Sequence, residues 1–237
     1  MTKPLIPMQT EFIYWRHHTP VGIKIEEISG GEDKKNPLWK EMAFQLYGEN
    51  GRDEYREIGH FASGAPFLRG SDQRISISHT RNMLVVATLP PTPDSDLKSF
   101  SPEAALGVDV EEADRNQVLR IRSRFLNDDE LRMITDTDVL ANITAWTAKE
   151  ALYKAAMSPD PYFRKSIRIL HLPEPVEEEK WLKYISSNAK PDISAAFGSA
   201  SVALSDGSVV RFNLYSYLSG PFVVTLAFSD LTATYND

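Results

Sequence analysis

Apolar and polar positions alternate in one short segment in the first half of the chain, and a period of two residues is typical of a half-buried strand. Segment 74–78 alternates in this way, and the apolar run 83–89 is rich in β-branched residues and ends at a group of prolines. These patterns predict two strands followed by a loop over 90–102. The N-terminal pattern is less regular, and we expect a strand within 11–25 and a helix within 38–47.

The second half changes to helical spacing and then returns to strands. Segment 116–125 has apolar residues at helical spacing, and Asn127 followed by Glu130 forms a capping-box pattern. The strongest helical pattern covers 138–157 and ends before Pro159. Strands are predicted around these helices, at 104–110, 166–172, 199–205, 209–218 and 222–228. Helices followed by an antiparallel sheet indicate an α+β fold.

The composition of the 237-residue chain narrows the classes of function. The chain has no cysteine, which excludes disulfides, thiolate metal sites and cysteine nucleophiles. Its formal net charge of -7 argues against non-specific nucleic-acid binding, which needs a strong positive field. Residues 1–10 lack the apolar run of a signal peptide, and no segment approaches the roughly 18 apolar residues of a membrane helix. We therefore expect a cytoplasmic protein that does not bind membranes.

Four arginines, Arg115, Arg120, Arg122 and Arg124, lie close together in this otherwise acidic chain. Such a cluster is either a solvated helix face or a local patch that attracts an acidic partner. The sequence leaves both interpretations open.

Three groups of polar residues are candidates for chemistry. Asp109 and Glu111 are two apart on an expected strand, so their carboxylates share one face, roughly 7 Å apart along the backbone, and can reach one hard cation. Glu150 and Lys154 are four apart on the expected helix, which is also the spacing of a surface ion pair. His79 follows an expected strand, where a histidine binds a phosphate oxygen or makes a structural hydrogen bond. Each group alone is more often structural than functional.

Taken together and in order, three segments carry a more specific signal. They read Ser-Ile-Ser-His at 76–79, Gly-Val-Asp-Val-Glu at 107–111, and Trp-Thr-Ala-Lys-Glu-Ala-Leu-Tyr-Lys at 146–154. This arrangement resembles the 4'-phosphopantetheinyl transferase superfamily, and more closely its longer, surfactin-synthetase-activating type. A further segment of that family is similar to 124–130, and the whole resemblance covers about 64–154.

The resemblance implies an α+β fold of two similar halves related by pseudo-twofold symmetry. We expect the N-terminal half to cover 1–102 and the C-terminal half, with the metal motifs, to cover 103–237. A chain that contains both halves is expected to build its site as a monomer.

The implied activity is the Mg²⁺-dependent transfer of the 4'-phosphopantetheine group of coenzyme A to a serine of an apo acyl or peptidyl carrier protein, with release of 3',5'-ADP. By the same resemblance, Asp109, Glu111 and Glu150 would hold Mg²⁺ against the pyrophosphate of coenzyme A. Either Glu150 or Glu130, or a metal-bound water, would accept the serine proton.

Further residues would contact coenzyme A, and the resemblance implies this role for Ser78, His79, Lys149 and Lys154. Of these, Lys154 and His79 would also act in catalysis, by stabilising charge on phosphate oxygens. The family has a short segment with a basic residue between glycine and proline, where this chain has Ala65. Arg69 would supply the missing contact from nearby.

Two alternatives are weighed against this function. A divergent member of the family would bind a carrier protein or coenzyme A without transferring the group, which the residue at Ala65 favours and the complete set of carboxylates opposes. An unrelated magnesium-dependent phosphohydrolase would explain the carboxylates but not the spacing within 146–154.

Overall fold

The computed structural model describes residues 11–14, 20–27, 58–62, 64–70, 74–80, 83–89, 105–157, 163–180, 183 and 192–229. For 11–14 and 20–27 it describes the backbone. The expected helix within 38–47, the loop over 90–102 and the boundary between 102 and 103 lie outside the described residues.

Six strands form the first sheet, in the order β1-β2-β6-β5-β4-β3, with antiparallel neighbours. Their bounds are β1 Glu11–Tyr14, β2 Pro20–Glu27, β3 Ile58–His60, β4 Pro66–Leu68, β5 Arg74–His79 and β6 Met83–Leu89. The strands β5 and β6 confirm the two strands predicted, the first from its alternating pattern and the second from its apolar, β-branched run. The N-terminal segment forms two antiparallel strands, β1 and β2, where the pattern predicts one.

The second sheet has the order β7-β12-β11-β10-β8, again with antiparallel neighbours, and the short β9 pairs in parallel with β11. Its strands are β7 Leu106–Glu112, β8 Ile167–His171, β9 Val176–Glu177, β10 Phe197–Ala203, β11 Val209–Ser219 and β12 Phe222–Ser229. The turns that join β10, β11 and β12 use Gly207 and Gly220, both with positive φ. The strands predicted for this half are confirmed.

The helices in the described residues all follow β7 in the chain. They are α2 Gln117–Phe125, α3 Asp128–Met133, α4 Val139–Ala155, α5 Phe163–Ser166 and the 3-10 helix η3 Ser194–Ala196. The predicted capping box at the start of α3 is present, because the Asn127 side chain accepts from the backbone N–H of Glu130 and the Glu130 carboxylate accepts from the backbone N–H of Asn127. No helix in the described part of the chain is long and apolar enough to cross a membrane.

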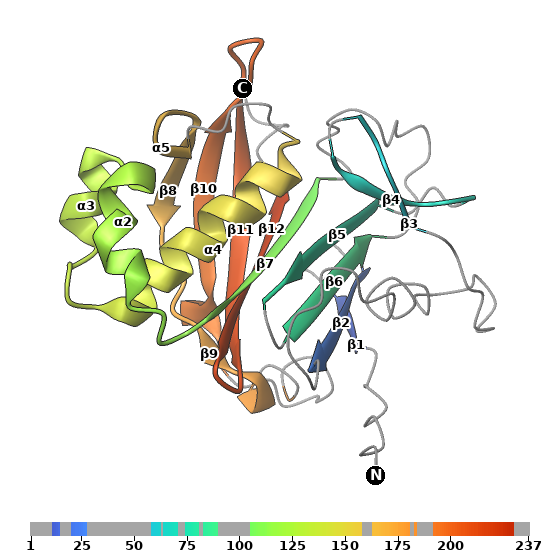
Figure 1. The fold of residues 1–237 in the computed structure, drawn as a ribbon, viewed down its shortest axis with the longest axis horizontal. Helices are drawn as coiled ribbons and strands as arrows, with labels where there is room; N and C mark the ends of the chain where they lie inside the picture. Colours follow the sequence, from blue (N-terminus) through green and yellow to red (C-terminus); the bar gives the residue numbers. More distant parts are fainter. Residues whose placement is uncertain are drawn as a thin grey trace.

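Two hydrophobic cores lie on opposite faces of the second sheet. The helix α4 crosses one face, and β5 and β6 of the first sheet pack beside β7 (Figure 1). The core under α4 includes Ala148 and Leu152, whereas the core toward the first sheet includes Val85, Val108 and Val110. Because side chains alternate along a strand, the residues between the β7 valines face α4.

Candidate active site

The two carboxylates of β7 lie on one side of the strand, as their spacing predicts. In the structure this side faces α4. Asp109 is paired in register with Thr225 of β12, at the edge of the second sheet. The Thr225 hydroxyl is 2.7 Å from the hydroxyl of Thr147 on α4 and 2.8 Å from that of Ser216 on β11. This chain of buried hydroxyls joins the helix to the sheet beneath the carboxylates.

Gly107 sets how closely α4 approaches β7. A Cβ atom at this position would lie 1.8 Å from the carbonyl oxygen of Ala151, so a side chain here would push the helix away. The facing residues of α4 are also small, since Ala148, Ala151 and Ala155 are all buried. The close approach brings Lys154 to the backbone of β7, where its ammonium donates to the carbonyl oxygen of Val108 at 2.9 Å.

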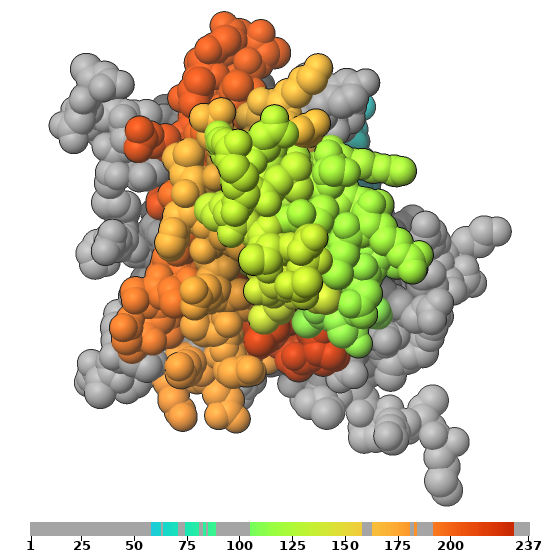
Figure 2. Space-filling view, turned by 90° about the vertical axis from the view of Figure 1, so that its left-hand side faces the viewer, coloured from blue at the N-terminus to red at the C-terminus, as the bar shows by residue number. Residues whose placement is uncertain are grey.

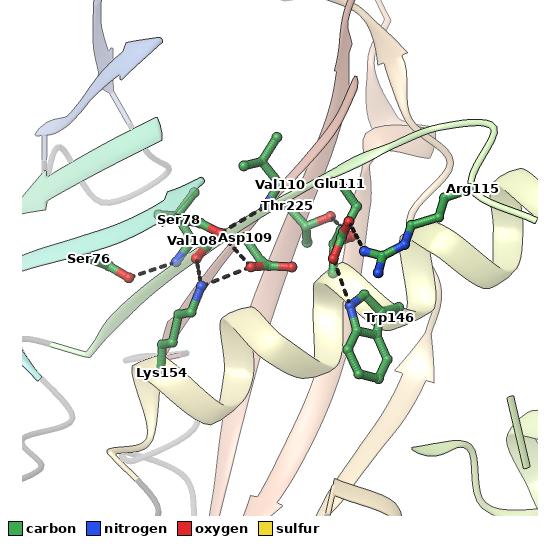
Figure 3. A network of polar contacts seen from close by, with 11 residues as sticks. Ser76, Ser78, Val108, Asp109, Val110, Glu111, Arg115, Trp146, Lys154 and Thr225 are labelled. Carbon is green, nitrogen blue, oxygen red and sulfur yellow. Dashed lines mark hydrogen bonds and ion pairs between the residues drawn. The ribbon is translucent and has the colours of Figure 1, made fainter. Parts of the chain in front are cut away.

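The two oxygens of Asp109 have different surroundings. Oδ1 accepts hydrogen bonds from the Ser78 hydroxyl at 2.6 Å and from the Lys154 ammonium at 2.8 Å. Oδ2 is buried and has no hydrogen-bond partner among the described residues. Figure 3 shows Oδ1 between Ser78 and Lys154 and the other oxygen turned toward the side of Glu111. A buried carboxylate oxygen without a partner costs free energy unless a ligand binds it.

Glu111 is held by two side chains. Arg115 donates to its Oε2 at 2.6 Å, and the indole N–H of Trp146 donates to its Oε1 at 3.3 Å (Figure 3). Burial raises the pKa of Glu111, the hydrogen bond from Arg115 opposes this, and the negative charge of Asp109 adds to it. The sequence patterns did not indicate Trp146 as a partner of this carboxylate.

Glu150 of α4 completes a group of like charges. Burial raises the pKa of Glu150 to about 7, and the negative charges of Asp109 and Glu111 act in the same direction while Lys154 opposes them. Lys154 forms its ion pair with Asp109, not with Glu150 as the spacing of four residues on a helix allows. The charges of Asp109 and Glu111 therefore add to the effect of burial on Glu150, and Lys154 offsets part of it.

These residues fit a divalent cation that prefers oxygen ligands. Within the described ranges, no three histidine, aspartate or glutamate side chains lie close enough together to hold an ion as they stand. The donors are nevertheless all carboxylates, Asp109 Oδ2 has no partner among the described residues, and burial together with like charges raises the pKa of Glu150. A cation bound among them would relieve both the repulsion and the missing contact.

Lys149 and Glu130 lie apart from this group and bind each other. The Lys149 ammonium is 2.7 Å from Glu130 Oε2 and donates to the carbonyl oxygen of Ile167 at 2.6 Å. The remaining oxygen of Glu130 accepts from the backbone N–H of Ile169 at 2.7 Å. Both side chains are fully buried, with exposed fractions of 0% and 1%, and burial lowers the pKa of Lys149 while Glu130 opposes this. The pair joins α3, α4 and β8, so we do not place either residue in the proposed chemistry.

The three remaining candidates from the first sheet have different positions. Ser78 is buried and points at Asp109. His79 is exposed at the end of β5, and strand alternation directs it away from the face that carries Ser78. In the described structure His79 has no hydrogen bond or ion pair with any of the three carboxylates. Arg69 is exposed directly after β4.

The arginine cluster divides into anchored and exposed members. Arg122 donates to the Asn142 side chain at 3.0 Å and to the carbonyl oxygen of Ile134, so it holds α2 against the start of α4. Arg115 is paired with Glu111. Arg120 and Arg124 are exposed on α2, which together with α3 lies in the green to yellow-green area of the face shown in Figure 2.

The residues of the site suit one kind of chemistry. Carboxylates of a strand and a helix, with a lysine between them, suit a divalent cation that carries phosphate oxygens. The model of the 4'-phosphopantetheinyl transferase superfamily matches residues 105–204, which is less than half of the chain. This range contains Asp109, Glu111, Glu150 and Lys154. No curated protein matches the chain.

Proposed function

We propose that the protein transfers the 4'-phosphopantetheine group of coenzyme A to a serine of an apo acyl or peptidyl carrier protein and releases 3',5'-ADP. The observation that carries the proposal is the group of three carboxylates between β7 and α4, with one buried oxygen left without a partner. The superfamily match over 105–204 covers this group and supports transfer of the phosphopantetheine type. The longer, surfactin-synthetase-activating type and a cytoplasmic location are part of the same proposal.

In this reaction the serine oxygen forms a bond to the β-phosphorus of coenzyme A, and the bond from that phosphorus to the bridging oxygen of the pyrophosphate breaks. We propose that Asp109, Glu111 and Glu150 would hold Mg²⁺. When bound, Mg²⁺ would neutralise the charge that develops on the phosphate oxygens. The Lys154 ammonium is paired with Asp109 and would add positive charge beside the departing oxygen.

The serine proton needs an acceptor, and we propose Glu150. Its pKa is raised to about 7 in the metal-free protein, and the positive charge of bound Mg²⁺ would lower it, so that the carboxylate would be ionised and able to accept a proton near neutral pH. Glu130, the other candidate from the sequence, has both oxygens occupied by Lys149 and by backbone N–H groups. Its side chain is also only 1% exposed, so the serine hydroxyl of a carrier protein would not reach it.

The exposed residues are the proposed contacts with the two substrates. His79 and Arg69 lie on the surface of the first sheet and would donate to the phosphates of coenzyme A. Arg120 and Arg124 would attract the carrier protein, because carriers of this family are acidic around the modified serine. The double variant Arg120→Glu with Arg124→Glu should raise KM for the carrier and leave KM for coenzyme A unchanged, with the exposed Arg211→Glu as a control. An unchanged KM for the carrier would exclude this docking face.

The function is tested by incubating the purified chain with coenzyme A, Mg²⁺ and an apo carrier protein, and then measuring the intact mass of the carrier. We expect the mass to increase by one phosphopantetheine group and 3',5'-ADP to appear in equal amount. A carrier whose acceptor serine is replaced by alanine should not change, and removal of Mg²⁺ with a chelator should stop the reaction.

A second measurement distinguishes the proposed transfer from the alternative of binding without transfer. The carriers in the panel are first shown to accept the group from a transferase of known activity. If this chain then binds coenzyme A, measured by calorimetry, but modifies none of those carriers, the proposed transfer is wrong and the binding function replaces it.

A further inference from the structure

The edge of β7 that faces the first sheet is covered by serine hydroxyls. The backbone N–H of Val108 donates to Ser76 Oγ at 3.0 Å, and the backbone N–H of Val110 donates to Ser78 Oγ at 3.4 Å. Ser76 and Ser78 are alternate residues of β5 and therefore point to the same side. We call Ser76, Ser78, Val108 and Val110 the serine seam. It supplies acceptors to backbone groups that the edge of a sheet otherwise leaves unpaired.

The two serines of the seam differ in one contact. Ser76 reaches the β7 backbone, whereas Ser78 also donates its hydroxyl proton to Asp109 Oδ1 at 2.6 Å. A hydroxyl has one proton to donate, so Ser78 uses it on the carboxylate and accepts from Val110 with a lone pair. Lys154 binds the same oxygen, and Figure 3 shows Ser78 and Lys154 on either side of it.

We infer that Ser78 is a positioning residue for Asp109. Its hydrogen bond fixes the rotation of the carboxylate, so that Oδ1 stays with Ser78 and Lys154 and Oδ2 faces the side of Glu111. The inference rests on the proposed function for the identity of the cation, Mg²⁺, that Oδ2 would bind.

The reason for a separate role of Ser78 is that Lys154 alone does not fix the carboxylate. The lysine side chain is flexible, and its three donors allow it to approach either oxygen of Asp109. Ser78 has a short side chain on a strand that is hydrogen-bonded to β6, so its hydroxyl occupies one place. Removing a partner that orients a metal ligand typically weakens metal affinity by about 10- to 100-fold.

The test compares Ser78→Ala with Ser76→Ala in the full chain, and it uses metal alone without coenzyme A or carrier. Both variants lose one hydrogen bond to the β7 backbone, but Ser78→Ala also loses the bond to Asp109. Binding of Mn²⁺ is measured by electron paramagnetic resonance and binding of Mg²⁺ by calorimetry. We expect Ser78→Ala to bind both ions about 10- to 100-fold more weakly than wild type. The metal affinity of Ser76→Ala should stay within about threefold of wild type. Its Tm should fall by about as much as that of Ser78→Ala.

Two further variants keep the inference testable if the alanine variant does not fold. Ser78→Thr keeps a hydroxyl and should restore most of the metal affinity. Ser78→Cys keeps the side-chain volume but is a weak donor, so it should bind Mn²⁺ as weakly as Ser78→Ala.

Equal Mn²⁺ affinities of wild type and Ser78→Ala, including no binding by either, would overturn the inference. Equal losses in Ser76→Ala and Ser78→Ala would also overturn it, because the seam as a whole would then be responsible. The proposed function fails separately. A wild-type chain that binds Mn²⁺ through Ser78-dependent contacts but transfers no phosphopantetheine leaves the positioning role intact.

Discussion

Lys149 and Glu150 are neighbours on α4, yet their charges meet opposite environments. Lys149 is fully buried against Glu130, and every oxygen of that carboxylate accepts a hydrogen bond. Glu150 lies near Asp109 and Glu111, and burial together with these charges raises its pKa to about 7. The first environment is a neutral, fully bonded pair that holds helices and sheet together. The second is a group of like charges that a cation would stabilise, which is the arrangement found at functional sites.

The largest effect is expected from Asp109→Ala. The change removes the unpartnered oxygen and the ion pair with Lys154, and transfer should fall by on the order of a thousandfold, equivalent to about 4 kcal/mol of barrier. The rate is measured from the intact mass of the carrier over time, at saturating Mg²⁺.

The fold of this variant should survive, because the side chain lies in a group of repelling charges. Circular dichroism and Tm check this, and Asp114→Ala, an exposed neighbour in the chain, is the matched control. Near-normal transfer by Asp109→Ala would exclude Asp109 from the site.

Lys149→Met removes the buried ion pair between Lys149 and Glu130. It leaves the Glu130 carboxylate buried without its cation, and losing one partner of a buried pair costs about 3–5 kcal/mol in the free energy of unfolding. Urea unfolding followed by fluorescence measures the loss. The double variant Glu130→Leu with Lys149→Met should recover part of it, because no buried charge is then left unpaired. A loss in Lys149→Met below about 1 kcal/mol would contradict the structural role.

Glu150→Gln should stabilise the metal-free protein at alkaline pH. Its pKa of about 7 lies above the ordinary value of 4.5, so the folded protein holds this proton more tightly than the unfolded chain. The contribution of Glu150 to stability therefore falls as pH rises from about 4.5 to about 7, and it stays low above that range. Glutamine does not ionise, so at pH ~8 the variant should exceed wild type by on the order of 1–3 kcal/mol in the free energy of unfolding.

Urea unfolding curves of both proteins, recorded from acidic to alkaline pH, check the sign of this pH dependence. The difference between Glu150→Gln and wild type should vanish at the acidic end, where the glutamate is protonated in both states. Added Mg²⁺ should reduce the difference in the free energy of unfolding at alkaline pH, because it stabilises wild type. A variant that is less stable than wild type at alkaline pH would show that the like charges around Glu150 are compensated.

The smallest effect is expected from Arg115→Ala. Its ion pair with Glu111 involves a side chain that is about half exposed, and such pairs contribute less than about 1 kcal/mol. Removing the arginine frees one oxygen of Glu111, so Mg²⁺ affinity measured by calorimetry should rise by roughly two- to fivefold. A lower affinity would mean that Arg115 orients Glu111 for the cation, and Lys165→Ala on α5 serves as a control.

Patterns in the sequence predicted those features of the structure that depend only on residues close together in the chain. Alternation along β5 and the apolar, β-branched run along β6 predicted these strands, because a half-buried strand exposes its two faces with a period of two residues. The capping box at Asn127 and Glu130 was predicted for the same reason, since its atoms lie within one turn of helix. The common face of Asp109 and Glu111 also followed from their spacing. The motifs at 107–111 and 146–154 indicated the superfamily that residues 105–204 match.

Tertiary structure decided which of the charged residues meet. Spacing along α4 allows Lys154 to pair with Glu150, but the small residues at Gly107 and Ala151 bring the helix so close to β7 that Lys154 reaches Asp109. Contacts between segments far apart in the chain likewise bring the Ser78 hydroxyl to Asp109, a contact that the sequence patterns did not indicate. Sequence patterns record which faces are apolar, whereas the neutralisation of a buried charge depends on which distant segment packs against it.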